Sequence, residues 1–265
     1  MTMHQGELDF ADKTVFVAGG SSGIGLGIAD AFAVRGANVA IASRSQERVD
    51  GAVSQLTAHG GAVAGFAADV RDAAAIADAL RQAFERFGAF DVLISGAAGN
   101  FVAAALDMSP NAFRTVVDID LNGTFNVLRA AHQYLKRPGA SVITISAPQA
   151  YNPMKYQAHV CAAKAGVDML TRVLAMEWGP DGIRVNAIVP GPIDDTEGVR
   201  RLAPTDDARR AMISTIPLGR MGTKQDVAEM ALVLSSRLAS YVTGAIIPVD
   251  GGMSLGGGRD LKAAR

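Results

Sequence analysis

The chain has 265 residues, of which 49% are hydrophobic, and a formal net charge of −1. This length suits one α/β domain with a sizeable core, and the balanced charge without a basic run predicts no nucleic-acid partner. Cys161 is the single cysteine, so it cannot form an internal disulfide and fits a reducing compartment. Since no apolar run reaches the roughly 18 residues of a membrane span, we expect no membrane-spanning helix.

The two ends of the chain bear on localisation. Residues 1–10 carry acids and lack the charged-then-apolar order of a signal peptide. The last four residues, Lys-Ala-Ala-Arg, differ from a peroxisomal tripeptide of the Ser-Lys-Leu kind. We therefore expect a cytoplasmic protein.

Short β-branched segments alternate with longer alanine-rich segments along the chain. The short segments predict strands, and apolar residues at three- and four-residue steps in the longer ones predict helices. The expected strands are residues 14–18, 39–42, 63–67, 92–95, 142–145, 184–189 and 245–249. The expected helices are residues 24–35, 46–58, 73–87, 111–135, 158–178 and 224–235.

The apolar character of the predicted strands is continuous rather than alternating. Such strands are buried on both faces, as in a parallel sheet covered by helices on each side. We therefore predict an α/β fold: one doubly wound, Rossmann-like parallel sheet of about seven strands, spanning residues 1–265 as a single domain. Residues 191–216 contain no clear strand and a short helical run near 206–214, so we expect a substrate loop there.

A glycine-rich turn follows the first predicted strand and opens the first helix. Glycines permit a tight turn and let a pyrophosphate approach the backbone, while the helix directs N–H groups and its positive dipole end at the anion. A purely structural turn is the alternative. The residues expected to bind a dinucleotide here are Gly19, Ser21, Ser22, Gly23, Ile24 and Gly25.

The end of the second strand bears on the choice between NAD and NADP. An acid at this position suits the ribose hydroxyls of NAD, whereas an arginine suits a 2′-phosphate. Ser43 stands where the acid would be, and Arg44 and Ser45 follow. We predict NADP(H), the alternative being an arginine that covers the adenine or lies in solvent.

Further motifs follow the third, fourth and sixth strands and a long helix. With these motifs the chain resembles the short-chain dehydrogenase/reductase family over nearly its whole length. The resemblance implies an adenine site at Asp69 and Val70, and a nicotinamide site that includes Lys164. The motifs are Asp69-Val70, Ala97-Ala98-Gly99, Lys164, Pro190-Gly191 and Asp250-Gly251-Gly252, and the resemblance adds Ile193 and Thr196 to the nicotinamide site.

The departures from the family pattern are as informative as the matches. The family's serine position holds Ala147, its tyrosine position holds Val160, and its asparagine position holds Asp120. Lys164 is retained. The phenol that would donate a proton to an alkoxide is therefore missing, so we do not expect reduction of a simple ketone.

One branch of the family shares these departures. The chain resembles the 2,4-dienoyl-CoA reductases of the peroxisomal type, which implies Asp120 and Lys164 as the catalytic pair. In the mitochondrial type a tyrosine and a serine act instead, and their positions here hold Gln149 and Val160. The segments that carry the resemblance are residues 97–101, 118–120, 123–127, 177–180, 190–193, 196–202 and 239–245, together with His159.

The chemistry of a conjugated thioester explains how the tyrosine can be absent. Hydride addition to the diene sends charge to the thioester oxygen, and a proton must then reach carbon, for which we expect a water held between a carboxylate and an ammonium. Asp120 and Lys164 fit that role, the alternatives being a carboxylate that braces the helix and a solvated lysine. His159 is a candidate donor to the thioester, or a structural histidine.

The remaining expectations follow from the resemblance. The CoA phosphates would meet Arg44, Arg71 and Arg201, because arginine binds phosphate in a bidentate manner. Phe101 and Ser109 are candidates for the acyl channel. Residues 239–252 resemble the family's tetramer-forming region, so we expect a homotetramer, and no metal site is predicted.

Three alternatives to a dienoyl-CoA reductase stay open. A trans-2-enoyl-CoA reductase is the nearest, although its relatives carry an arginine at the position of Lys164. A carbonyl reductase would need a displaced tyrosine, either Tyr151 or Tyr156. A non-catalytic NADP-binding module would bind the cofactor without hydride transfer to any CoA ester.

Overall fold

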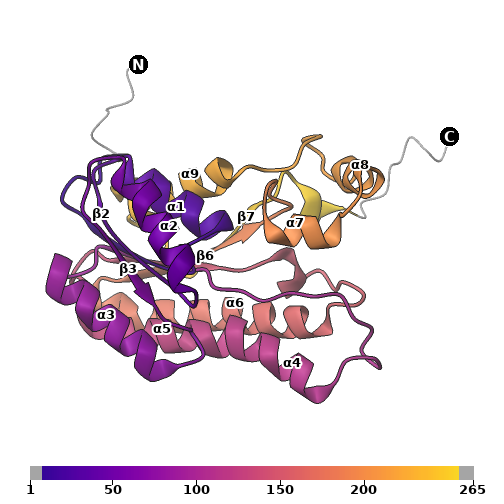
Figure 1. Cartoon of the computed structure of the whole chain (residues 1–265), viewed down its shortest axis with the longest axis horizontal. Coiled ribbons are helices and arrows are strands. Elements are labelled where there is room, and N and C mark those ends of the chain that lie inside the picture. The colour runs from indigo at the N-terminus through magenta and orange to yellow at the C-terminus, as the bar shows by residue number, and fades with distance from the viewer. Residues whose placement is uncertain (1–7, 257–265) are drawn as a thin grey trace.

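The computed structural model describes residues 8–256, which form one seven-stranded parallel sheet with the strand order β3-β2-β1-β4-β5-β6-β7 (Figure 1). The order reverses between β1 and β4, which is the switch point where doubly wound sheets bind ligands. The predicted fold class is confirmed. The prediction about a signal peptide rests on residues 1–10, which lie partly outside the described residues. The prediction from the last four residues, Lys-Ala-Ala-Arg, lies wholly outside them.

Every predicted strand is present, with ends that differ by one residue at most. The β-branched runs pair in continuous parallel register. Some strands are one residue longer than predicted, because the residue next to the run also pairs with the neighbouring strand. The strands are β1 (Thr14–Ala18), β2 (Asn38–Ser43), β3 (Val63–Ala67), β4 (Val92–Ser95), β5 (Ser141–Ile145), β6 (Arg184–Pro190) and β7 (Ile246–Val249).

Helices cover both faces of the sheet. One apolar core joins α1, α2 and α9 to one face, and a second joins α3, α5 and α6 to the other (Figure 1). Among residues 8–256 no helix is long and apolar enough to cross a bilayer. The helices are α1 (Gly23–Ala33), α2 (Gln46–Thr57), α3 (Ala73–Phe87), α4 (Pro110–Val117), α5 (Gly123–Ala131), α6 (Ala158–Trp178), α7 (Glu197–Leu202), α8 (Asp206–Ser214) and α9 (Lys224–Ser235).

The prediction of one continuous helix over residues 111–135 is wrong. A π-helical turn, Asp118–Asn122, separates α4 from α5, and a 3₁₀ turn, His132–Tyr134, follows α5. A π turn inserts one residue and rotates the helix beyond it, a change that apolar spacing alone does not reveal. Such turns are frequent at functional sites, and this one carries Asp120.

Residues 191–216 contain more helix than the sequence predicts. The helical run at 206–214 is present as α8, and α7 precedes it. Threonines cap both helices: Thr196 Oγ1 accepts from Val199 N–H at 3.4 Å, and Thr205 Oγ1 accepts from Ala208 N–H at 3.2 Å. These short helices lie at the carboxyl end of the sheet, where the candidate active site is found (Figure 1).

Candidate active site

The turn after β1 is built so closely that only glycine fits at two of its positions. Gly19 has φ +83°, and a Cβ there would lie 2.7 Å from the backbone nitrogen of Ala97. A Cβ on Gly25 would lie 2.2 Å from the carbonyl oxygen of Gly19. The turn therefore packs backbone against backbone, at the edge where β1 and β4 end.

The N-terminus of α1 is left available to an anion. Ser22 is the N-cap, but its side chain makes no capping hydrogen bond, and the first turn contains no acid. First-turn N–H groups have no partner inside a helix, so here they and the dipole can receive a phosphate. Together with the glycine cradle, this arrangement fits a dinucleotide. The remaining residues predicted for this turn, Ser21, Gly23 and Ile24, lie between Gly19 and Gly25 as expected.

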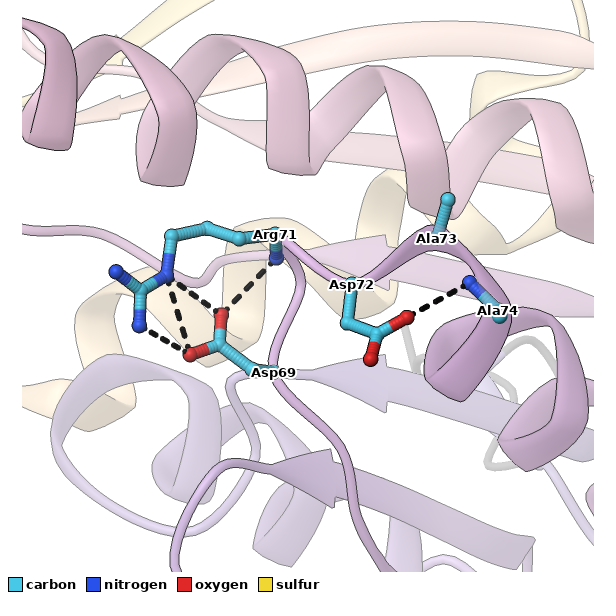
Figure 2. A pocket seen from close by; sticks show the side chains of 5 residues that line it. All are labelled: Asp69, Arg71, Asp72, Ala73 and Ala74. Carbon is cyan, nitrogen blue, oxygen red and sulfur yellow. Dashed lines mark hydrogen bonds and ion pairs between the residues drawn. The ribbon is translucent and has the colours of Figure 1, made fainter.

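Asp69 and Arg71, which follow β3, form an ion pair. Arg71 Nη2 lies 2.6 Å from Asp69 Oδ2, and Arg71 Nε donates to Asp69 Oδ1 at 3.0 Å. The Arg71 guanidinium holds the pKa of Asp69 below its usual value, and Arg44 contributes further in the same direction. Figure 2 shows Arg71 folded back on Asp69 in a shallow hollow that Asp72 also lines. The guanidinium predicted to bind CoA is thus partnered by a carboxylate.

The other residues predicted for the adenine end differ in their contacts. The Arg44 side chain is exposed and makes no hydrogen bond or ion pair within the described chain. Ser45 caps α2 by accepting from Arg48 N–H at 3.4 Å. Val70 is buried against Gly123, where a Cβ would come within 2.6 Å of its side chain. Arg44 is therefore the residue here whose charge is free to meet a ligand.

Asp120 and Lys164 lie next to each other near the carboxyl ends of β4 and β5. Lys164 Nζ lies 3.3 Å from Asp120 Oδ2, and the two residues are only 5% and 1% exposed. Lys164 also donates to the carbonyl oxygen of Ile145 at 2.9 Å, and Asp120 Oδ1 accepts from Gly99 N–H at 2.7 Å. Asp120 Oδ2 has no hydrogen-bond partner in the described chain. The pair thus keeps one acceptor and two ammonium N–H donors for other groups.

The π turn holds Asp120 in this place. The carbonyl oxygen of Asp120 accepts from Thr124 Oγ1 at 2.7 Å. Ser95 Oγ, at the end of β4, donates to the same Thr124 hydroxyl at 3.4 Å. All three residues are buried. The carboxylate is therefore fixed by the sheet, by α5 and by the loop after β4.

His159 lies at the start of α6 and is completely buried. Its ring stacks on Phe101 with 4.1 Å between centroids and 35° between planes. Neither ring nitrogen has a hydrogen-bond partner among the described residues. Burial lowers the pKa of His159, and the backbone of Phe101 and then the charge of Asp120 oppose this effect in part. The His159 ring faces Phe101, so the two residues, both predicted for the site, lie side by side.

The positions of the family's serine and tyrosine cannot supply a proton. Val160 is 3% exposed, and Ala147 immediately precedes the 3₁₀ turn Pro148–Ala150 after β5. The two tyrosines that could replace the missing phenol are both on the surface: Tyr151 is 45% exposed and Tyr156 is 57% exposed.

A row of side-chain amides borders the site, and sequence reasoning missed most of it. Gln149 Nε2 donates to Gln157 Oε1 at 2.8 Å, and Gln157 Nε2 donates to Asn100 Oδ1 at 3.1 Å. Gln157 is 1% exposed and precedes α6. The available signal was a polar residue two positions before His159, immediately ahead of a predicted helix.

The segment after β6 packs closely at the carboxyl edge of the sheet. A Cβ on Gly191 would lie 2.7 Å from Asp250 Cα, Ile193 is 2% exposed, and Thr196 Oγ1 donates to the Ile193 carbonyl at 2.6 Å. Pro190 ends β6. These residues, predicted for the nicotinamide, are all at the carboxyl edge of the sheet.

Arg201 joins α7 to the loop after β4. Its Nη1 donates to the carbonyl oxygen of Asn100 at 2.6 Å, and its Nε donates to Glu197 at 2.8 Å. Ser109, predicted for the acyl channel, is exposed and caps α4 by accepting from Ala112 N–H at 3.1 Å. Arg201 therefore already has two partners, and the Ser109 hydroxyl has a capping role. Among residues 8–256 no group of acids, histidines and cysteines is arranged to hold a metal ion.

Comparison with known proteins shows which family the chain belongs to. Residues 18–254 match a family model described as enoyl-(acyl carrier protein) reductase. The chain is 45% identical over 253 residues to the peroxisomal 2,4-dienoyl-CoA reductase [(3E)-enoyl-CoA-producing] of Pongo abelii, covering 95% of this chain and 87% of that protein. It is 39% identical to a probable 2,4-dienoyl-CoA reductase [(2E)-enoyl-CoA-producing] of Bacillus subtilis, covering 92% and 97%.

Solved structures show the same fold. A short-chain type dehydrogenase/reductase from Mycobacterium ulcerans has a TM-score of 0.89 and 34% identity, with 97% of this chain and 94% of that chain covered. A short chain dehydrogenase from Bacillus anthracis has a TM-score of 0.86 and 38% identity, covering 94% and 98%. The family model, the relatives and the shared fold together show that this chain is an oxidoreductase of the short-chain dehydrogenase/reductase family.

Proposed function

We propose that the protein is an NADPH-dependent 2,4-dienoyl-CoA reductase that yields an enoyl-CoA. The observation that carries the proposal is the buried pair of Asp120 and Lys164, 3.3 Å apart, in a site where Val160 and Ala147 replace the family's proton-donating side chains. The relatives named as dienoyl-CoA reductases support this reaction kind.

The reaction needs two additions to the diene. A nicotinamide held by the glycine turn and Lys164 would supply a hydride to C5 of the dienoyl group, and the electron pairs would shift so that negative charge develops on the thioester oxygen. Asp120 and Lys164 would then hold a water that gives a proton to carbon, and solvent would protonate the hydroxide that is left. Addition at C2 leaves a 3-enoyl thioester, and addition at C4 leaves a 2-enoyl thioester. Asp120 Oδ2 is available to accept from that water, and two Lys164 N–H groups are available to the water and to the cofactor ribose.

Three features support NADPH as the reductant. The glycine turn and the uncapped N-terminus of α1 suit a pyrophosphate. Ser43 leaves no acid opposite the ribose at the end of β2. Arg44 is exposed and without a partner in the described chain, so its guanidinium can meet a 2′-phosphate.

The substrate side of the proposal uses residues 191–216 as a substrate loop. Arg71 and Arg201 reach CoA phosphates by exchanging their present carboxylate partners, Asp69 and Glu197, for the ligand. Phe101 forms one wall of the acyl site with His159, and Ser109 lies in the same loop after β4, at the start of α4.

We also propose one domain over residues 1–265, a cytoplasmic location and a homotetramer. Strand β7 lies at the edge of the sheet, where a second subunit could pack against it.

The deciding experiment measures NADPH oxidation with a 2,4-dienoyl-CoA, for the wild type and for Lys164→Ala. We expect turnover by the wild type and its loss in the variant. Absence of wild-type turnover above the variant would contradict the proposal. Mass and NMR analysis of the product would then assign the 3-enoyl or 2-enoyl position, since relatives of both product types are similar to this chain.

An enoyl thioester reductase is the second candidate, because the matching family model is described as an enoyl-(acyl carrier protein) reductase. A parallel assay with a trans-2-enoyl-CoA separates the two reactions. A higher kcat/KM for the enoyl than for the dienoyl substrate would favour this second candidate. NADPH binding without turnover of either substrate would favour a non-catalytic module.

A further inference from the structure

Residues 191–216 leave the sheet from a fixed base. Asp194 N–H donates to the carbonyl oxygen of Gly222 at 2.8 Å, and Gly222 N–H donates to the carbonyl oxygen of Pro192 at 2.9 Å. A Cβ on Gly222 would lie 2.6 Å from Ile193 Cδ1. The first residues of the segment are therefore held against the chain just before α9.

Beyond this base, α7 and α8 have little apolar packing. Val199 is the one buried residue of α7, and α8 contains none. The apolar cluster that Val199 joins has two other buried members, Ile216 and Met221. Segments with few buried apolar contacts open locally at a low free-energy cost, so polar contacts decide how firmly these two helices are held.

Two adjacent carboxylates supply polar contacts of this kind. Asp194 Oδ1 accepts from Arg209 of α8 at 2.6 Å, and Asp195 Oδ2 accepts from Lys224 at the start of α9 at 2.8 Å. Asp195 Oδ1 accepts from Arg200 of α7 at 3.2 Å. Arg209 and Lys224 hold the pKa values of Asp194 and Asp195 below the usual value, so both carboxylates are charged at neutral pH.

The backbone of Asp195 is in the left-handed region, with φ +54°. Among the described residues only two other non-glycine residues, Asp12 and Tyr156, have a positive φ. Such a conformation persists where the surrounding contacts hold it, and at Asp195 these include the ion pairs to α7 and α9. Lys224 is itself fixed at its base, because a Cβ on Gly27 of α1 would lie 2.6 Å from Lys224 Cβ.

We propose that Asp194 and Asp195 form an ionic clasp that holds α7 and α8 against the loop after β4, and that opening of this clasp admits the acyl-CoA. The closed position is the one in which Arg201 of α7 donates to the carbonyl oxygen of Asn100 at 2.6 Å. Asp195 is a positioning residue, since it holds α7 without touching the substrate. The identity of the ligand rests on the proposed function, whereas the clasp consists of contacts within the chain.

Asp195→Asn tests the clasp with little change of shape, because asparagine, like aspartate, tolerates a positive φ. The apparent affinity of a ligand scales with the fraction of protein in the binding state, so a looser clasp raises KM. We expect KM for a 2,4-dienoyl-CoA to rise about two- to fivefold, the range of exposed ion pairs, without a fall in kcat. A change that only lowered the folded fraction would reduce kcat and leave KM unchanged. An unchanged KM in Asp195→Asn would overturn the proposal.

Lys224→Met breaks the same ion pair from the side of α9 and keeps the carbons that pack against Gly27. It should raise KM by a similar factor, and the double variant should do no worse than Asp195→Asn alone, because both changes remove one shared contact. Additive increases would contradict the clasp. Asp78→Asn is the matched control: Asp78 is also exposed and pairs with Arg81 inside α3 at 2.6 Å, so this variant should keep the wild-type KM.

A proteolysis arm separates the clasp from the proposed reaction. Each of α7 and α8 contains two consecutive arginines, so trypsin cuts them when the helices open, with no substrate or cofactor present. Cleavage at these arginines, located by mass spectrometry, should be about two- to fivefold faster in Asp195→Asn than in the wild type or Asp78→Asn. Faster cleavage supports the clasp even if the wild type fails to reduce a dienoyl-CoA, which would count against the reaction alone. Equal cleavage rates would overturn the clasp.

Discussion

Lys164 Nζ lies 3.3 Å from Asp120 Oδ2, with both side chains almost fully removed from solvent. Their remaining bonds go to backbone groups: Lys164 to the carbonyl of Ile145, and Asp120 to the N–H of Gly99. The pair therefore links α6, the π turn, β5 and the loop after β4. It combines a structural role with the chemistry proposed for the site.

Removing one partner of this pair should damage both stability and turnover. Asp120→Asn or Lys164→Met leaves an uncompensated buried charge, which costs about 3–5 kcal/mol of unfolding free energy. The double variant should lose less than the sum of the two single losses. Urea denaturation measures the cycle, and NADPH oxidation measures turnover, which we expect to vanish in all three variants. Additive losses would mean that the two charges do not interact.

The glycine turn gives a prediction with an internal control. Gly25→Ala places a Cβ 2.2 Å from the Gly19 carbonyl, so the turn must open, and NADPH binding should be lost. Gly51 in α2 has open space where a Cβ would stand, so Gly51→Ala should stabilise the protein by about 0.5–1 kcal/mol. NADPH fluorescence and thermal denaturation compare the two. Retained binding in Gly25→Ala would show that the turn does not hold the pyrophosphate.

Arg44 should set the preference between the two nicotinamide cofactors. Arg44→Ala removes a charged hydrogen-bond donor to a 2′-phosphate, so kcat/KM with NADPH should fall about 10- to 100-fold while that with NADH changes little. Arg48→Ala, in the first turn of α2 and also exposed, is the control and should leave the ratio unchanged. A ratio that is the same in Arg44→Ala and in the wild type would contradict the assignment.

Burial of His159 makes a prediction about pH. Its folded pKa is below the usual value of about 6.5, so below that pH the unfolded chain binds a proton that the folded chain does not bind. Stability should therefore fall as the pH falls through 6.5 and level off below the folded pKa. His159→Gln should reduce this slope, measured as unfolding free energy from pH 5 to pH 7. His132, whose pKa is also lowered chiefly by burial, accounts for the slope that remains.

The surface tyrosines should be dispensable for hydride transfer. Tyr151 and Tyr156 are 45% and 57% exposed, so their phenols are not held in the buried site with Lys164. Tyr151→Phe and Tyr156→Phe should each keep dienoyl-CoA turnover within about twofold of wild type, as expected for exposed side chains. If the wild type reduced ketones at a high rate and either variant lost that activity, the protein would instead be a carbonyl reductase.

Much of the architecture could be read from local patterns. Continuous β-branched runs identified the strands, because strands buried on both faces need apolar side chains throughout. The glycines before α1 were identifiable because close backbone packing tolerates no other residue, as Gly25 illustrates. The pairing of Asp120 with Lys164 was expected only through family resemblance, since 44 positions separate them in the chain.

The sequence by itself determined the sheet, most of the helices that cover it and the glycine-rich turn before α1, and the family resemblance indicated the loss of the usual proton donors. Only the tertiary structure decided where the remaining polar groups meet. The π turn that carries Asp120 escaped prediction because one inserted residue hardly alters apolar periodicity. The bond from Gln157 to Asn100 joins residues 57 positions apart, and its direction depends on which amide oxygen is already engaged. Such contacts form only when loops from separate strands converge at one edge of the sheet.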